Sequence, residues 1–407
     1  MAASTLIATP VSRMNPLSQA SLRQIVSEEV AGVCATLVGL EAIIMTGSMA
    51  RDEASFADHN ETIAVRGDAE FLLVFENTRV PSADAIERQA KLVESRLMGR
   101  NIHCKVCLSP VSTAFLEGIT PHIFGYELLR CGQVVWGNPN VLARIPAFDA
   151  NEIPLDDAVR LLCNRMVELL ELVAASGPLS KQAQYATVKL CLDMATSFLV
   201  FSGRYRPTYR DRLEEIKNLR KAETPEAPFS LSEFARLVEY STHAKLSCDQ
   251  SANAFRTDFE AREHFLVETI QLAHSLLRWE LQRLLKCGAS ISDEGLLARW
   301  ADFQPWTFRL RGWARVFRDA NTTTTRSNWW RWLGLARHTS PRQGIYFAAC
   351  LLLFRVPALL RNEQSESFQD LNRHLPISIE ADDLIEWRSL AALIARNYHQ
   401  FLEFTRT

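Results

Sequence analysis

Two carboxylates are the residues of this chain whose spacing best fits a chemical role. Asp68 and Glu70 stand two positions apart in an apolar run that ends at Phe75. Side chains at positions i and i+2 of a strand point to one face of the sheet, so both carboxylates can hold the same cation. Carboxylate oxygens are the ligands that hard cations prefer. The pair therefore predicts a site for Mg²⁺ or Mn²⁺.

A glycine–serine pair precedes these carboxylates. Gly47 and Ser48 follow the apolar run Ala42–Met45 and predict a tight turn that leads into a helix. Free backbone N–H groups at such a turn can bind an anion, and glycine lets the backbone come close to a phosphate. Ser48 can add its hydroxyl, and Arg51 stands one helical turn further on, where its guanidinium can reach the same phosphates. The turn and the carboxylates together indicate a site for a metal-bound polyphosphate.

Each of the two motifs also has a purely structural explanation. A Gly-Ser pair before a helix is often a turn with an N-cap, and an Asp-x-Glu pair at the start of a strand is often a solvated edge. The order of the motifs, with an apolar strand beside each, favours the chemical interpretation.

This order resembles the DNA polymerase beta-like nucleotidyltransferase superfamily, in which a Gly-Ser turn is followed by an Asp-x-Asp or Asp-x-Glu pair at the start of a hydrophobic strand. The matching residues are Gly47, Ser48, Asp68 and Glu70, and the resemblance covers roughly the first 140 residues. The run GSMARDE, residues 47–53, is similar to bacterial members with a large helical partner domain. The resemblance implies transfer of a nucleoside monophosphate from a nucleoside triphosphate to a hydroxyl acceptor that the sequence does not identify.

One residue of the family's pattern is missing. In the family, a third strand usually supplies a third carboxylate that helps to hold the metal and to activate the attacking hydroxyl. The corresponding run here, Ile102–Cys107, contains no acid. Glu53 could substitute for the missing carboxylate. Lys105 could supply the positive charge of a metal ion, or it could be an ordinary solvated strand residue. A nucleotide-binding regulator without turnover, or an interaction protein that uses its helical domain, therefore remain alternatives to the enzyme.

The elements that must position these residues can be read from periodicity and turn signals. We expect an α+β protein with an N-terminal nucleotidyltransferase-type mixed sheet and flanking helices, residues 1–150, followed by an all-helical domain, residues 151–407. In the first domain we expect helices over 18–36, 82–98 and 123–130, and strands over 42–45, 102–108 and 133–136, besides the strand that Asp68 and Glu70 enter. The main helices of the second domain are expected over 156–175, 181–202, 231–240, 258–286, 292–300, 346–360 and 379–404.

The helix expected over 181–202 places Tyr185, Lys189 and Asp193 on one face, since they are spaced four residues apart. Nucleotidyltransferases with a helical second domain often carry a lysine on the helix that faces the nucleotide. By this resemblance, Lys189 would neutralise the triphosphate and either Tyr185 or Tyr205 would stack on the base. The alternative is a solvated ion pair between Lys189 and Asp193 on an ordinary helix.

The segment Trp306–His338 combines five tryptophans and seven arginines with a single acid, Asp319. Such a mixture can contact a nucleic acid or a membrane surface. We favour a core edge in which tryptophan packs and arginine extends to solvent. The run Asn321–Thr325 inside this segment is expected to be an exposed loop.

Composition limits the remaining classes of function. A net charge of −2 argues against binding of nucleic acid by bulk electrostatics. The N-terminus lacks a basic segment followed by a long apolar core, and the longest apolar run, Ile345–Phe354, is too short to span a bilayer. We therefore expect a cytoplasmic protein without a transmembrane segment. Cys104 and Cys107 form a single CxxC whose sulfurs would point to opposite faces of a strand, which argues against a zinc site.

Overall fold

The computed structural model describes residues 18–59, 62–76, 80–219, 227–247, 259–319, 329–361, 368–377 and 386–403. It divides into two compact units. The first comprises Met1–Ile119 and Glu127–Pro146, and the second comprises Thr120–Tyr126 and Ala147–Thr407. The chain is thus a mixed α+β protein, as the sequence predicted, with every strand of the described residues in the first unit.

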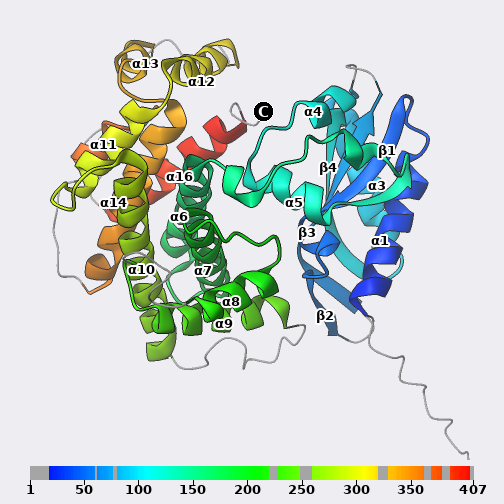
Figure 1. Ribbon diagram of the computed structural model, residues 1–407, viewed down its shortest axis with the longest axis horizontal. Helices are drawn as coiled ribbons and strands as arrows, with labels where there is room; N and C mark the ends of the chain where they lie inside the picture. The colour runs from blue at the N-terminus through cyan, green and yellow to red at the C-terminus, as the bar shows by residue number, and fades with distance from the viewer. Residues whose placement is uncertain are drawn as a thin grey trace, which may run out of the picture. The chain divides into compact units, whose positions relative to one another are not determined.

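The first unit is built on a five-stranded sheet (Figure 1). Its elements are α1 (Gln19–Cys34), β1 (Leu40–Thr46), α2 (Gly47–Ala50), β2 (Ser55–His59), β3 (Thr62–Phe75), α3 (Ala83–Met98), β4 (Ile102–Ser112), α4 (Thr113–Glu117), β5 (Gln133–Gly137) and the 3₁₀ turn η1 (Val141–Arg144). Helix α5 (Ile123–Cys131) begins in the second unit and ends in the first.

Strand β3 is the centre of this sheet. Strand β1 pairs antiparallel with its C-terminal half, from Glu70 to Phe75, and β2 pairs antiparallel with its N-terminal half. Strand β4 pairs parallel with β3, and α3 makes the crossover that a parallel pair requires. Strand β5 extends the sheet on the far side of β1. The sheet is therefore mixed, with one parallel pair.

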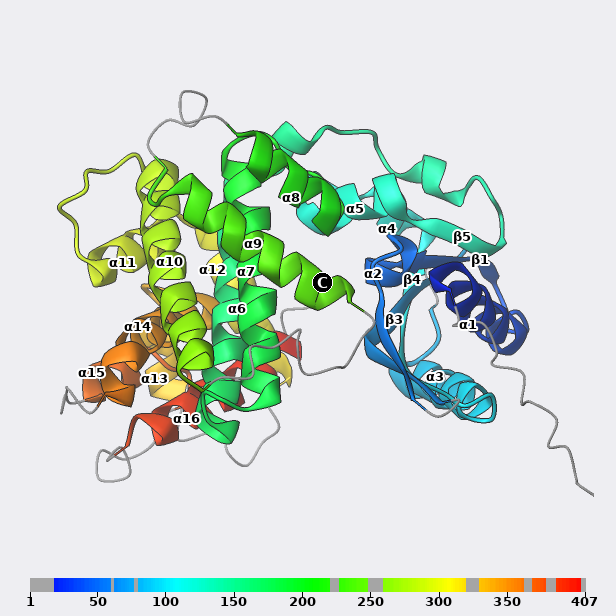
Figure 2. The same ribbon diagram turned by 90° about the horizontal axis from the view of Figure 1, so that it is seen from below.

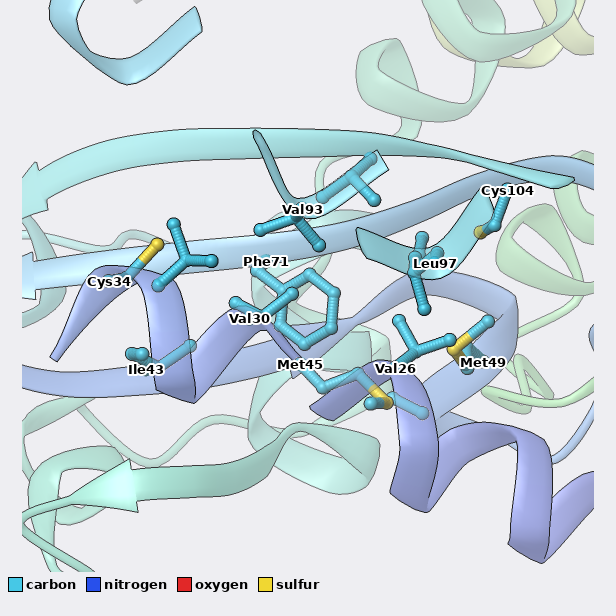
Figure 3. Close-up of a cluster of buried hydrophobic side chains, with 14 of the residues drawn as sticks. Val26, Val30, Cys34, Ile43, Met45, Met49, Phe71, Val93, Leu97 and Cys104 are labelled. Carbon is cyan, nitrogen blue, oxygen red and sulfur yellow. The ribbon is translucent and has the colours of Figure 1, made fainter. Parts of the chain in front are cut away.

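The core of the first unit lies between this sheet and helices α1 and α3. Figure 3 shows Val26 and Val30 of α1, Val93 of α3 and Phe71 of β3 pointing toward one another. The cluster contains further buried residues besides these four. Burial of a Val or Phe side chain contributes about 1.5–3 kcal/mol, so this cluster fixes which face of β3 points inward.

The second unit is helical. Besides the short turns η2 (Ala150–Glu152) and α15 (Gln369–Asn372), its helices are α6 (Leu155–Ser176), α7 (Lys181–Phe201), α8 (Tyr209–Asn218), α9 (Leu231–Leu246), α10 (Phe259–Leu285), α11 (Asp293–Phe303), α12 (Trp306–Asp319), α13 (Trp329–Ala336), α14 (Pro341–Leu360) and α16 (Trp387–Glu403). Figure 2 shows α6 and α7 side by side, with α10 and α14 against them. Most side chains of α7 are buried, which makes it a central helix of this unit.

Helix α14 is longer than the apolar run Ile345–Phe354 that it contains. By length and composition it is the one helix of the described residues that could cross a membrane. However, 72% of its most apolar stretch is buried inside the protein, as in the core helix of a soluble protein. The described residues thus contain no clear transmembrane segment.

Two predictions about the first unit were wrong. Strand β2 lies between Gly47 and Asp68, where we expected no strand. Strand β3 begins at Thr62, so Asp68 and Glu70 lie inside a 14-residue strand and not at its entrance. The first half of β3 is only partly buried and pairs with β2, a contact that the hydrophobic pattern does not reveal.

Candidate functional site

The carboxylates of Asp68 and Glu70 lie on the face of β3 opposite the core. Ala69, between them, is fully buried on the side that α1 and α3 cover. Because strand side chains alternate, Asp68 and Glu70 share the other face. Asp68 lies beside Lys105 in the register of β4, and Glu70 lies opposite Thr46 at the end of β1. The pair therefore stands where β1 leads into the Gly47-Ser48 turn.

Gly47 contacts Glu70 directly. Its backbone φ is +68°, a conformation that L side chains rarely adopt, and a β-carbon placed on it would lie 2.0 Å from Glu70 Oε2. No other residue type fits this turn without moving the carboxylate. The predicted phosphate turn and a predicted metal carboxylate are thus adjacent, although Gly47 and Glu70 stand 23 positions apart in the sequence.

Helix α2 is a single turn held in place from two directions. The Glu53 amide donates to the Ser48 carbonyl at 2.8 Å, and the Gln133 side chain of β5 donates to the Ala50 carbonyl at 2.6 Å. Thr46 precedes the helix but makes no side-chain capping bond to it. The first N–H groups of this turn are therefore not used by the usual N-cap hydroxyl.

Asp68 has a cation and a thiol beside it. Lys105 Nζ lies 3.6 Å from Asp68 Oδ2, and the Cys107 thiol donates to the same oxygen at 3.4 Å. Burial, and then the charge of Asp68, raise the pKa of Cys107 to about 11, so this thiol stays protonated. The Asp68–Lys105 pair is open to solvent, with 36% and 70% of the two side chains exposed. Cys104 faces the core, on the side of the strand opposite Cys107, and both are free cysteines.

The Arg51 side chain is turned into the protein. Only 7% of it is exposed, and it forms ion pairs with Glu53 at 3.3 Å and with Glu127 of α5 at 2.6 Å. Glu53 is itself fully buried. These pairs fasten the end of α2, and the contact of Arg51 with a phosphate stays a prediction. Glu53, the substitute that we considered for the missing acid, is engaged by Arg51.

The residues present suit a magnesium ion better than a metal that needs a complete protein cage. In the described ranges no three His, Cys, Asp or Glu side chains gather closely enough to hold a metal by themselves. Mg²⁺ is ordinarily bound by one or two carboxylates together with waters and the phosphates of a substrate. Asp68 and Glu70 meet that requirement in ligand type and number.

In the second unit, Tyr185 lies close to two lysines. Lys189 Nζ lies 5.4 Å from the centre of its ring and Lys245 Nζ lies 5.6 Å from it. Lys245, buried on α9, also donates to the Tyr185 hydroxyl at 2.9 Å. Both distances are within the range of a cation–π interaction. Lys245 was not identified from the sequence, because this residue belongs to another helix and its neighbours in the sequence form no motif.

The alternative explanation for Lys189 does not hold in the structure. Asp193 forms its ion pair with Arg165 of α6, at 2.7 Å, and not with Lys189. The charge of Asp193, with that of Glu168, raises the pKa of Arg165 against the effect of burial, so the guanidinium stays ionised. Within the part of the chain that the structure describes, Lys189 has no carboxylate partner.

Comparison with protein-family models, with curated proteins and with solved structures finds no match for this chain.

Proposed function

We propose that this protein is a nucleotidyltransferase that transfers a nucleoside monophosphate from a nucleoside triphosphate to a hydroxyl acceptor. One observation carries the proposal, namely the contact between Gly47 and the Glu70 carboxylate. It supports the proposal because a phosphate bound by the turn and a cation bound by the carboxylates would be neighbours. Metal-bound polyphosphate chemistry requires that arrangement.

In this proposal each residue has a separate task. The backbone N–H groups at Gly47 and Ser48 bind the terminal phosphates, while Asp68 and Glu70 hold the cation. When bound, Mg²⁺ or Mn²⁺ neutralises charge on the phosphoryl oxygens and on the leaving pyrophosphate. The acceptor oxygen forms a bond to the α-phosphorus as the bond to the β-phosphate oxygen breaks, and the acceptor's proton passes to solvent. For the second unit, contact of Lys189 with a triphosphate and of Tyr185 with a base stays a prediction.

A second candidate is a nucleotide-binding regulator on the same site. The observation that favours it is Lys105, whose ammonium stands beside Asp68 on the strand where the family usually carries its third carboxylate. An ammonium cannot accept the proton of an attacking hydroxyl. Binding of the nucleotide would then persist while the chemical step is slow.

Two measurements test these proposals. Calorimetric titration with a nucleoside triphosphate, with and without Mg²⁺, should show metal-dependent binding that Asp68→Asn weakens while the melting temperature changes little. If Asp68→Asn and the unmodified protein bind the nucleotide with equal affinity, the proposed metal site is ruled out. Pyrophosphate release then separates enzyme from regulator. For location, we propose the cytoplasm, since α14, the one helix of the described residues that could cross a membrane, is mostly buried.

A further inference from the structure

Helices α12 and α13 expose large apolar side chains that we expected to pack in a core. Trp330 is 83% exposed and Trp306 is 68% exposed. Trp313 and Trp332, on the same two helices, are buried, and their indole N–H groups donate to the carbonyls of Thr339 and Pro376. The core-edge interpretation is therefore right for those two tryptophans only. Each helix has one face in the protein and another face in solvent.

The exposed apolar side chains come from two helices that contact each other. Trp306 and Leu310 are spaced by one turn on α12, as are Trp329 and Leu333 on α13. Phe317, two turns beyond Leu310, makes an edge contact with Trp329 at 5.5 Å between ring centres. Figure 1 shows the two helices next to each other at one end of the helical unit. We call this surface, Trp306, Leu310, Trp329, Trp330 and Leu333, the α12–α13 face.

Among the described residues, the arginines around this face have no acidic partners. Arg311, Arg315 and Arg337 make no ion pair in the described ranges. Arg309 and Arg331 donate to the backbone carbonyls of Arg337 and Leu375, which leaves their charges uncompensated. Residues 303–317 and 329–338 contain no Asp or Glu. The chain as a whole carries a net charge of −2, so this positive charge is a local feature.

We propose that the α12–α13 face binds the surface of a lipid bilayer that contains anionic headgroups. Amphipathic helices with Trp and Leu on one side and arginine beside them lie at the boundary between headgroups and acyl chains. Tryptophan is enriched at that depth, and each arginine near an anionic surface adds attraction. Leu310 and Leu333 decide against a nucleic acid, because aliphatic side chains give no stacking platform for bases. This proposal is independent of the nucleotide site.

Vesicle co-sedimentation of the full chain tests the proposal. We expect binding to vesicles of phosphatidylcholine mixed with phosphatidylglycerol, weak binding to phosphatidylcholine alone, and loss of binding at high salt. The double variant Trp330→Ser/Leu333→Ser should lose most of the binding. Arg311→Glu should reduce the partition coefficient by roughly fivefold or more, since each basic residue contributes about 1 kcal/mol near such a surface.

Leu92→Ser provides the matched control. Leu92 lies on α3 of the first unit and is 46% exposed, as is Leu333. This variant should bind vesicles like the unmodified protein, and circular dichroism should show that all variants are folded. Vesicle binding that is unchanged in the double variant would overturn the proposal. So would an absence of vesicle binding together with salt-sensitive binding of a single-stranded oligonucleotide, which would assign the face to nucleic acid instead.

Discussion

The α-carbon of Gly47 lies against the carboxylate of Glu70, so closely that a methyl group on Gly47 would come 2.0 Å from Oε2. Real β-carbons do not approach another atom so closely. Glycine is therefore required at this turn for two reasons, its φ of +68° and the space that Glu70 occupies. The two effects can be separated by experiment, because another glycine has the first property without the second.

Gly47→Ala should abolish Mg²⁺-dependent nucleotide binding. The new methyl group must displace the Glu70 carboxylate, and the positive φ adds a cost of about 1–2 kcal/mol to folding. Isothermal titration with a nucleoside triphosphate measures the first effect and urea denaturation measures the second. Gly39→Ala is the control, since Gly39 has a φ of +80° but nothing within 4 Å of its β-carbon position. If both variants bind nucleotide equally well, the contact with Glu70 has no functional role.

Lys105→Met should strengthen Mg²⁺ binding roughly two- to fivefold, since it removes a cation that competes for Asp68 in an exposed ion pair worth about 0.5–1 kcal/mol. The measurement is a Mg²⁺ titration at a fixed nucleotide concentration. Lys91→Met is the matched control, because Lys91 is also 70% exposed and is paired with Glu87 on α3. Weaker Mg²⁺ binding in Lys105→Met would contradict the assignment of Asp68 to the metal.

Lys189→Met should weaken binding of a nucleoside triphosphate roughly tenfold, or about 1.4 kcal/mol, and binding of a monophosphate much less. Lys189 has no carboxylate partner in the described residues, so the melting temperature should hardly change. Lys181→Met, at the exposed start of the same helix, should leave binding unaltered. The same loss for monophosphate and triphosphate would mean that Lys189 does not neutralise the phosphate chain.

Glu280 of α10 should make the protein less stable as the pH rises. It is fully buried, and among the described residues neither of its oxygens accepts a hydrogen bond of normal geometry. Burial raises its pKa from 4.5 to about 8, with a smaller opposite effect of Ser197. The folded state keeps the proton up to about pH 8, whereas the unfolded chain loses it above about pH 4.5. Unfolding then releases a proton, and stability falls between these two values.

Glu280→Gln should remove this pH dependence and stabilise the protein at pH 7 by an amount on the order of 3 kcal/mol. Urea denaturation at several pH values between 4.5 and 8 measures the slope. Glu214→Gln, a change at an exposed carboxylate on α8, is expected to preserve the slope. An unaltered slope in Glu280→Gln would show that other groups control the dependence.

The amino-acid sequence by itself determined most of the elements of the first unit and the long helices of the second. Apolar side chains that repeat every two or every 3.6 residues predict a strand or a helix from local information alone. Helix α3, predicted over 82–98, is observed over Ala83–Met98, with Ser82 capping it. The expected run Asn321–Thr325 lies outside the described residues, as does part of the helix expected over 379–404.

Which side chains meet depends on how the elements pack in three dimensions. Gly47 contacts Glu70 because β1 pairs antiparallel with β3, and Lys105 meets Asp68 because β4 pairs parallel with β3. Arg51 forms an ion pair with a carboxylate of another helix, and Asp193 forms one with a guanidinium of another helix. Lys245 donates a hydrogen bond to Tyr185 from a different helix. Such pairings depend on strand register and helix packing, and both arise because many residues are buried together. The periodicity of the sequence assigns only which face of each element is apolar.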